Sequence, residues 1–263
     1  MRSLPARAAV LAACVVGPAA AQDMLQIPRL SPDMMRAEMT REEVVAAIEA
    51  APEGVPPDLS GKKLSGLDLS GIDFRGAILR LAYLNDANLA GANLDGVILD
   101  QAWAVKADLS GASLKNASLQ VGQMQGSILD GADLSDSRIT ANLAKARLVG
   151  AKLSGANLSA DMRNQSMGLT RGVLYQAVMD RADLRDANLS FADLRFASLK
   201  AADLSGADMT AAQIAGANLT GAKVGGAIFS SADVNSAKLL ALVDADKAVD
   251  LESARNIRRA YRD

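Results

Sequence analysis

The sequence predicts an all-β solenoid, a rod of stacked coils with a short helical cap at each end. The main observation is a period of five residues, as in RADLR DANLS FADLR FASLK AADLS over 181–205. A helix repeats every 3.6 residues and a strand every two, so neither fits as a continuous element. The period fits a short unit with two inward positions two residues apart, followed by a bend. Composition agrees, because 50% hydrophobic but only 3% aromatic residues require a core of aliphatic and very small side chains.

The large apolar residue of each unit is called its centre here. Centres recur every five residues from Leu59 to Ile139, run one residue early from Leu143 to Leu158, and return to the first frame from Leu169 to Leu239. All are Leu, Ile, Val, Met or Phe except Ala104 and Asn164. The residue two positions before the centre is mostly Ala, Gly or Ser, and the one just before it is most often Asp, Asn or Ser.

This A-(D/N)-L-x-x pattern resembles the pentapeptide-repeat family, and the resemblance covers residues 57–241. It implies a right-handed quadrilateral β-helix of about nine coils, with four units in each square coil. Centres would point to the axis, and the small residue two positions earlier would also point inward. Family members of the quinolone-resistance type mimic DNA, whereas signal-bearing members occur in the bacterial periplasm and the thylakoid lumen.

Residues 1–21 are predicted to be a secretory signal peptide. Two arginines and no acid precede an apolar run at 8–16, and the alanines at 19–21 form an A-x-A cleavage site. The apolar run is too short to span a bilayer, and no later segment has an unbroken run of that length. Cleavage after Ala21 would leave a mature protein that begins at Gln22 and is periplasmic or secreted.

The single cysteine, Cys14, leaves a second interpretation open. Residues 11–14, LAAC, resemble a bacterial lipobox, in which the cysteine is lipidated and becomes the new N-terminus. The apolar stretch before Cys14 is short, and Val15 and Val16 follow where lipoproteins usually turn polar. Ordinary cleavage is therefore favoured, and it would leave no cysteine in the mature chain.

Helices are expected to cover both ends of the rod. Thr40 and Glu43 form a capping box, which predicts a helix over 41–51 within an N-terminal segment, 22–56. A second, amphipathic helix is predicted within 242–263. Its apolar residues lie at helical spacing: Leu251, Ala254, Ile257 and Tyr261.

An apolar surface patch is the main candidate site. Residues 20 apart should stack on one face, and Tyr83 with Trp103 form such a pair at outward positions. The candidate partner-binding patch comprises Ile78, Leu81, Tyr83, Ile98, Trp103, Val105 and Val121. An apolar patch on a polar rod indicates that something covers it. The favoured cover is the chain's own segment 22–39 folded back, and the alternative is a protein partner or a second copy.

Two further irregularities are candidates for contact. In ADMRNQSMG, residues 160–168, the five-residue frame shifts. The simpler interpretation is a bulge that restores the register, and the other is a partner-binding loop containing Met162, Arg163, Asn164 and Gln165. In the second region Arg195 follows Tyr175 by 20 residues, so its guanidinium can stack on that ring, although solvated corner residues are the simpler interpretation.

Composition excludes several kinds of chemistry. The chain has no histidine and one cysteine, so it has no Ser-His-Asp triad, no His-ligated zinc and no intramolecular disulfide. Its Asp and Ser residues follow the repeat, so no catalytic, cofactor or metal site is predicted. A formal net charge of −2 gives no basic surface for nucleic acid.

The sequence thus predicts a non-enzymatic, exported solenoid that acts as a protein-interaction scaffold for an unknown protein partner or as a homodimer. The alternative is a DNA-mimicking, topoisomerase-binding protein of the quinolone-resistance type. Those relatives are strongly acidic and cytoplasmic, and this chain differs from them in both respects.

Overall fold

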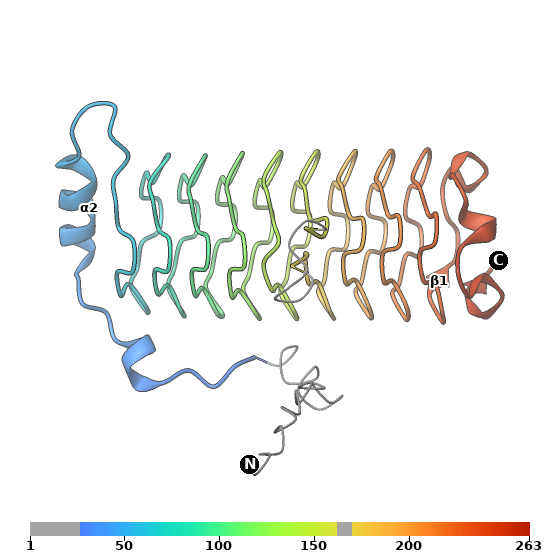
Figure 1. Cartoon of the computed structure of the whole chain (residues 1–263), viewed down its shortest axis with the longest axis horizontal. Coiled ribbons are helices and arrows are strands. Elements are labelled where there is room, and N and C mark those ends of the chain that lie inside the picture. The colour runs from blue at the N-terminus through green and yellow to red at the C-terminus, as the bar shows by residue number, and fades with distance from the viewer. Residues whose placement is uncertain (1–26, 162–169) are drawn as a thin grey trace, which may run out of the picture.

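The protein forms an elongated rod in a computed structural model, which describes residues 27–161 and 170–263 (Figure 1). Four ladders of parallel β-bridges run along its length. On one of them Tyr83 pairs with Trp103, and Trp103 pairs with Gln123. Most ladder partners are 20 residues apart, so each coil has four sides of five residues.

Hydrogen bonds between coils account for the ladders. The amide of Leu59 donates to the carbonyl of Ile78 at 2.8 Å, and the amide of Ile78 donates back to Pro57 at 2.8 Å. Because each coil exposes backbone groups on both of its edges, neighbouring coils satisfy one another and stability arises from stacking.

Each unit ends in a tight turn that makes one corner of the coil. At the first corner the amide of Lys62 donates to the carbonyl of Leu59 at 3.2 Å, and Gly61 between them has φ +68°. A positive φ at this position favours glycine. The Asp58 carboxylate accepts from the Ser60 amide at 2.9 Å, which explains why Asp, Asn or Ser so often precedes a centre.

The core is one continuous column of aliphatic side chains. Every described centre, from Leu59 to Leu158 and from Leu174 to Leu239, is buried, which confirms the predicted frame. The small residues two positions before the centres are buried beside them, from Ala77 onward. Among the described residues, two aromatic side chains lie in this column, Phe74 and Phe229.

Helix α2, Arg41–Glu49, covers the N-terminal end of the rod. It begins where the sequence predicts and ends two residues before the expected 51. The capping box is present: the Glu43 amide donates to Thr40 Oγ1 at 3.3 Å, and the Thr40 amide donates to Glu43 Oε2 at 2.8 Å. Val44 is fully buried against the first coil.

Arg41 covers part of the open edge of that coil. Its guanidinium donates to the carbonyls of Asp68 and Ser70 at 2.7 and 2.8 Å. These carbonyls have no preceding coil to pair with, so the arginine replaces the missing strand.

The predicted C-terminal α-helix is wrong. Residues 242–263 instead contain three short 3-10 helices and a strand, β2 (Tyr261–Arg262), which pairs in parallel with β1 (Lys238–Leu239). The 3-10 helices are η2 (Ala245–Lys247), η3 (Leu251–Ser253) and η4 (Ile257–Arg259).

The C-terminal segment is a further coil with sides of six residues. Val243, Val249 and Arg255 continue three of the ladders at this spacing, and Asp244 and Asp250 take the left-handed corner conformation at φ +58°. The extra residue in each side is accommodated by one turn of 3-10 helix. The apolar residues Leu251, Ala254 and Ile257 are spaced three residues apart. This spacing fits one face of a helix and also fits a coil with six-residue sides, so the sequence predicted a helix.

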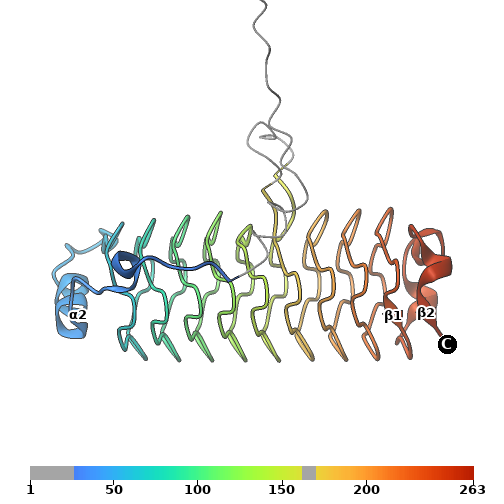
Figure 2. The same cartoon turned by 90° about the horizontal axis from the view of Figure 1, so that it is seen from below.

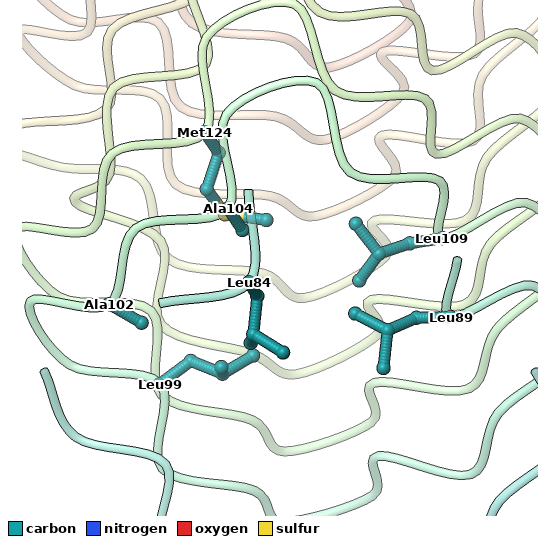
Figure 3. Close-up of a pocket in the computed structure, with 7 residues that line it drawn as sticks. All are labelled: Leu84, Leu89, Leu99, Ala102, Ala104, Leu109 and Met124. Carbon is teal, nitrogen blue, oxygen red and sulfur yellow. The ribbon is translucent and has the colours of Figure 1, made fainter. Parts of the chain in front are cut away.

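An underpacked site lies in the core at Ala104, a centre position occupied elsewhere by larger residues. A cavity of about 10 Å³ is lined by Leu84, Leu89, Leu99, Ala102, Ala104, Leu109 and Met124 (Figure 3). Met124 reaches toward Ala104 from the next coil. The lining is apolar, so the space favours hydrocarbon over water.

Replacing Ala104 by leucine should raise the free energy of unfolding by about 1 kcal/mol, because buried methyl groups fill the space while the flexible Met124 withdraws. Denaturant titration measures the change. Ala107→Leu is the matched control, since Ala107 occupies the small inward position of the next unit. It should cost about 1–3 kcal/mol through overpacking. Equal effects of the two substitutions would contradict the assignment of centre and small positions.

Candidate functional site

The apolar patch surrounds one corner of the rod. Leu81, Gln101 and Val121 occupy equivalent turn positions on successive coils, and this column is called the Leu81 corner. Leu81 is 53% exposed and Val121 is 49% exposed. Both side chains therefore project from the corner into solvent.

The backbone at these two residues takes the left-handed corner conformation. Leu81 and Val121 each have φ +59°, as do Gln101 between them and many other non-glycine corner residues, whereas glycine fills other corners, including Gly61. The left-handed region costs a residue with a side chain about 1–2 kcal/mol, and a β-branched residue such as valine is a clear outlier there. Because both side chains remain half exposed, core packing does not offset this cost. Among the described residues Val121 is the one β-branched side chain at a left-handed corner, so the cost is highest there.

Four half-buried side chains flank the corner. Ile78 pairs with Ile98 on the ladder at one side, and Tyr83 pairs with Trp103 on the ladder at the other. The structure thus brings six of the seven predicted residues together. From here the apolar patch means Ile78, Leu81, Tyr83, Ile98, Trp103 and Val121.

The seventh residue, Val105, does not belong to the patch. It lies at the next corner, where Ser65, Asn85 and Gln125 occupy equivalent positions, and only 1% of it is exposed. This column is called the Asn85 corner. Its prediction as a surface residue was wrong because the chain's own residues 27–38 lie over it.

Residues 27–38, called the strap, run along the rod across successive coils (Figure 2). The Met34 carbonyl accepts from Ser65 Oγ at 2.7 Å and from Asn85 Nδ2 at 3.1 Å. Within the strap, η1 (Pro32–Met35) forms one 3-10 turn. The predicted return of the N-terminal segment onto the rod is thus correct for these residues, but it covers the Asn85 corner and leaves Leu81 and Val121 exposed.

Asn85 is the main polar anchor of the strap. It is fully buried. Its side-chain Oδ1 accepts from the backbone amide of Val105 at 3.1 Å, and its backbone amide donates to Ser65 Oγ at 3.1 Å. Asp33 also pairs with Lys63 at 2.7 Å. Sequence reasoning missed this anchor, although an Asn and a Ser spaced 20 apart at turn positions were available as a signal.

The frame shift has a clear structural origin. Arg138 and Asn142 stand on neighbouring ladders only four residues apart, and on the next coil Asn157 and Val173 stand 16 apart. The segment 158–172 between Asn157 and Val173 is called the insertion, and the predicted centres Asn164 and Leu169 within it lie outside the described residues. The candidate loop residues Met162, Arg163, Asn164 and Gln165 lie outside the described residues.

The base of this insertion is hydrogen-bonded at the Leu81 corner. The Asp161 amide donates to the Thr170 carbonyl at 2.8 Å, and the Gly172 amide donates to Leu158 at 2.9 Å. A Cβ on Gly172 would lie 3.0 Å from Leu158 and 3.1 Å from the Ile139 carbonyl, so the chain re-enters the rod through a narrow gap. The insertion and the apolar patch thus share one corner.

A buried ion network lies beyond the insertion. Asp193 is 2% exposed, and its carboxylate accepts from Arg195 Nε at 2.8 Å and from Nη2 at 2.6 Å. Arg171 Nη2 lies 3.6 Å from the same carboxylate. Burial lowers the pKa of Arg171, while its hydrogen bonds to the Asp193 carboxylate raise the pKa of Arg195. Two cations on one carboxylate leave the cluster with a positive charge.

Aromatic rings extend this cluster. The Arg195 guanidinium lies 5.6 Å from the centre of the Tyr175 ring, and Phe196 meets Tyr175 edge to face at 5.7 Å. The stacking of Arg195 on Tyr175, considered from their spacing of 20, is therefore present. Phe196 is 56% exposed and lies over Gly216, where an added Cβ would come within 2.6 Å of its ring.

The described residues do not assemble a metal site. Within 27–161 and 170–263, no three Asp, Glu, His or Cys side chains are grouped closely enough to hold a metal ion. Acidic residues on the outer faces are instead interleaved with bases, as where Asp133 lies 3.7 Å from both Lys115 and Lys152. Across these same two stretches, no helix has the length and apolar character needed to cross a bilayer.

Comparison with known proteins identifies the family. The sequence profile of pentapeptide repeats matches in eight copies, over residues 58–101, 95–131, 107–141, 123–159, 169–195 and 192–233. The chain therefore belongs to the pentapeptide-repeat family, and the family implies a right-handed quadrilateral β-helix. A comparison with curated proteins gives no match.

Solved structures of the same family are similar to this chain. HetL, a regulator of heterocyst differentiation from the cyanobacterium Nostoc sp. strain PCC 7120, is 26% identical over 85% of this chain and 95% of its own, with a TM-score of 0.33. QnrB1, a plasmid-mediated fluoroquinolone resistance protein, is 16% identical over 75% of this chain and 89% of its own, with a TM-score of 0.43. A thylakoid-lumen protein of Arabidopsis thaliana is 27% identical over 45% of this chain and 68% of its own, with a TM-score of 0.26.

Proposed function

We propose that this chain is a non-enzymatic, exported scaffold that binds a protein partner through the apolar patch. The observation that carries the proposal is the pair Leu81 and Val121, two apolar side chains that are 53% and 49% exposed at one corner of the rod. Tyr83 and Trp103 beside them are of the residue types that dominate protein–protein contacts. Export rests on the predicted signal peptide at 1–21.

Val121→Gly should raise the stability of the protein and weaken its binding to the partner. The substitution relieves about 1–2 kcal/mol of left-handed strain and adds about 0.5–1 kcal/mol of unfolded-chain entropy, so we expect a net gain of roughly 0.5–1 kcal/mol in the free energy of unfolding. Binding should weaken, because an exposed apolar contact is lost. Cross-linking and pull-down of the exported protein, combined with denaturant titration, measure both effects.

Ala201→Gly is the control for that substitution. Ala201 has φ +52° at another corner, so glycine relieves the same kind of strain there without touching the apolar patch. The proposal is supported if the parent protein and Ala201→Gly capture a partner that Val121→Gly and Tyr83→Asp do not capture. An unchanged set of partners in all variants would reject the apolar patch as the site.

Export is tested by the intact mass of the protein recovered outside the cytoplasm. A chain beginning at Gln22 supports the proposed cleavage after Ala21. A diacylated N-terminus at Cys14 would show a lipid-anchored protein, and recovery of the uncleaved chain in the cytoplasm would contradict export.

The topoisomerase-binding alternative receives no specific support from the surface. A DNA mimic needs an extended line of negative charge, whereas here Lys115, Lys152 and Lys223 interrupt the carboxylates of their face through ion pairs. A gyrase-protection assay tests the alternative, and protection at micromolar protein would revive it.

A further inference from the structure

The Asn85 corner is a continuous track along the rod, and the strap occupies only part of it. Ser65, Asn85, Val105 and Gln125 are all buried there, and Ala144, next along the corner, is buried as well. Further along the same corner stand Tyr175 and Arg195, with exposed Phe196 beside them. The track thus leads to the ion and aromatic cluster.

The strap points toward this cluster. The backbone amide of Glu38 donates to the Lys63 carbonyl on the first coil at 2.9 Å. Ile27 packs on Gly126, where an added Cβ would lie 2.9 Å from the Ile27 Cδ1. Going toward the N-terminus, the chain therefore advances along the rod in the direction of Tyr175.

The distance fits the next few residues. Gln176 lies two coils beyond Gly126 and Phe196 lies three coils beyond it, which is about 10 and 14 Å at a coil spacing of about 4.8 Å. Residues 22–26, which lie outside the described residues, span about 16 Å when extended at about 3.3 Å per residue.

The chemistry fits as well. Residues 22–26 read QDMLQ, a carboxylate followed by two apolar side chains. The cluster offers the complement, since Arg171 and Arg195 share the single charge of Asp193 and leave a net cation beside the open ring of Phe196. The other Asp-x-Arg pairs of the rod, such as Asp183 with Arg185, lie on exposed faces without a second arginine or a ring.

We propose that residues 22–26 extend the strap along the Asn85 corner and dock on Tyr175, Arg195 and Phe196. The Asp23 carboxylate reaches the coil of Arg195 and faces the two arginines, and Met24 lies beside Tyr175 on the coil before it. The site accepts an extended, acidic and apolar segment, and the occupant is the chain's own N-terminal segment. This inference is independent of the apolar patch, which lies on earlier coils of the rod.

Disulfide trapping tests the docking in the full chain carrying Cys14→Ser, which contains no other cysteine. We expect the pair Leu25→Cys and Gln176→Cys to form an intramolecular disulfide under mild oxidation, because bridged Cα atoms must come within about 4.4–6.8 Å. The control pairs Leu25→Cys with Asp186→Cys. Gln176 and Asp186 are both exposed corner residues at φ +57° on the same coil, but Asp186 stands at the opposite corner.

The initial rate of disulfide formation, followed by mass spectrometry of peptide fragments, decides the outcome. A rate at least tenfold higher for the Gln176 pair supports docking. Equal rates, or no disulfide at Gln176, would overturn it. A disulfide that joins two chains would show that a second copy is the occupant and would also overturn the proposal.

Charge substitutions at Asp23 provide a second measurement. Asp23→Lys should lower the trapping rate at Gln176 at least fivefold, because it places a cation against Arg171 and Arg195, whereas Asp23→Glu should retain the parent rate. Equal rates for both variants would reject the ionic contact. Thermal unfolding of each variant confirms that the rod itself is unchanged, since position 23 lies outside the repeats.

Discussion

Leu148→Ala should lower the free energy of unfolding by about 2–5 kcal/mol, the range for a fully buried leucine whose removal leaves a cavity. Leu148 is a centre in the middle of the rod and is completely buried. The coils above and below are held by the same column of side chains, so they cannot collapse into the space without losing their own hydrogen bonds. Denaturant titration followed by circular dichroism measures the loss.

Leu81→Ala is the control for the core substitution. It removes the same atoms from a side chain that is 53% exposed at a corner, and alanine keeps the left-handed strain, so we expect a loss below about 1 kcal/mol. Similar losses at the two positions would contradict the distinction between centre and corner. A changed denaturant slope for Leu148→Ala alone would indicate that the rod unfolds in more than one block.

The core of this fold was predictable because the same pattern of inward residues recurs in every repeat unit. Each unit contributes one large and one small inward side chain, so an error at a single unit such as Ala104 does not disturb the frame. The N-terminal cap was predictable for a different reason, since the capping box of Thr40 and Glu43 is local and needs no knowledge of the rod.

The C-terminal coil shows where a pattern has two solutions. Leu251 and Ile257 stand six residues apart, and a helix with Ala254 between them satisfies the same positions. The alternative signal was the recurrence of Asp244, Asp250 and Asn256 at that spacing, each at a left-handed corner. A six-residue side and a helix differ in backbone conformation at the corner residues. The pattern of polar and apolar residues alone does not reveal that difference.

The surface was less predictable because it depends on contacts between distant segments. The apolar patch was predicted from residues 20 apart, and the structure places six of its seven members around one corner. Val105 was misplaced because its exposure is decided by the strap, and the link between Asn85 and Met34 joins residues 51 apart with no repeat to signal it. Arg171 escaped notice as an ion partner because it reaches Asp193 diagonally, 22 residues on, whereas most ladder partners are 20 apart.

Asp193→Ala should lower the free energy of unfolding by about 2–4 kcal/mol, because it leaves two arginines facing each other without their shared carboxylate. The side chain of Arg171 is only 19% exposed, so water replaces little of the lost interaction. The range lies slightly below that for fully buried pairs, since Arg195 is partly solvated. Denaturant titration measures the loss, and the fluorescence of Tyr175 reports whether Arg195 leaves its ring.

Asp183→Ala is the matched control, because Asp183 makes the same two-residue contact with Arg185, at 2.7 Å, on an exposed face. Exposed pairs contribute about 0–1 kcal/mol, so the loss there should stay below 1 kcal/mol. If the two substitutions cost the same, burial of Asp193 would have no energetic consequence. Arg171→Ala in the Asp193→Ala background should restore part of the lost free energy of unfolding. That result would show that repulsion between the two arginines causes the loss, and that the cluster is positively charged.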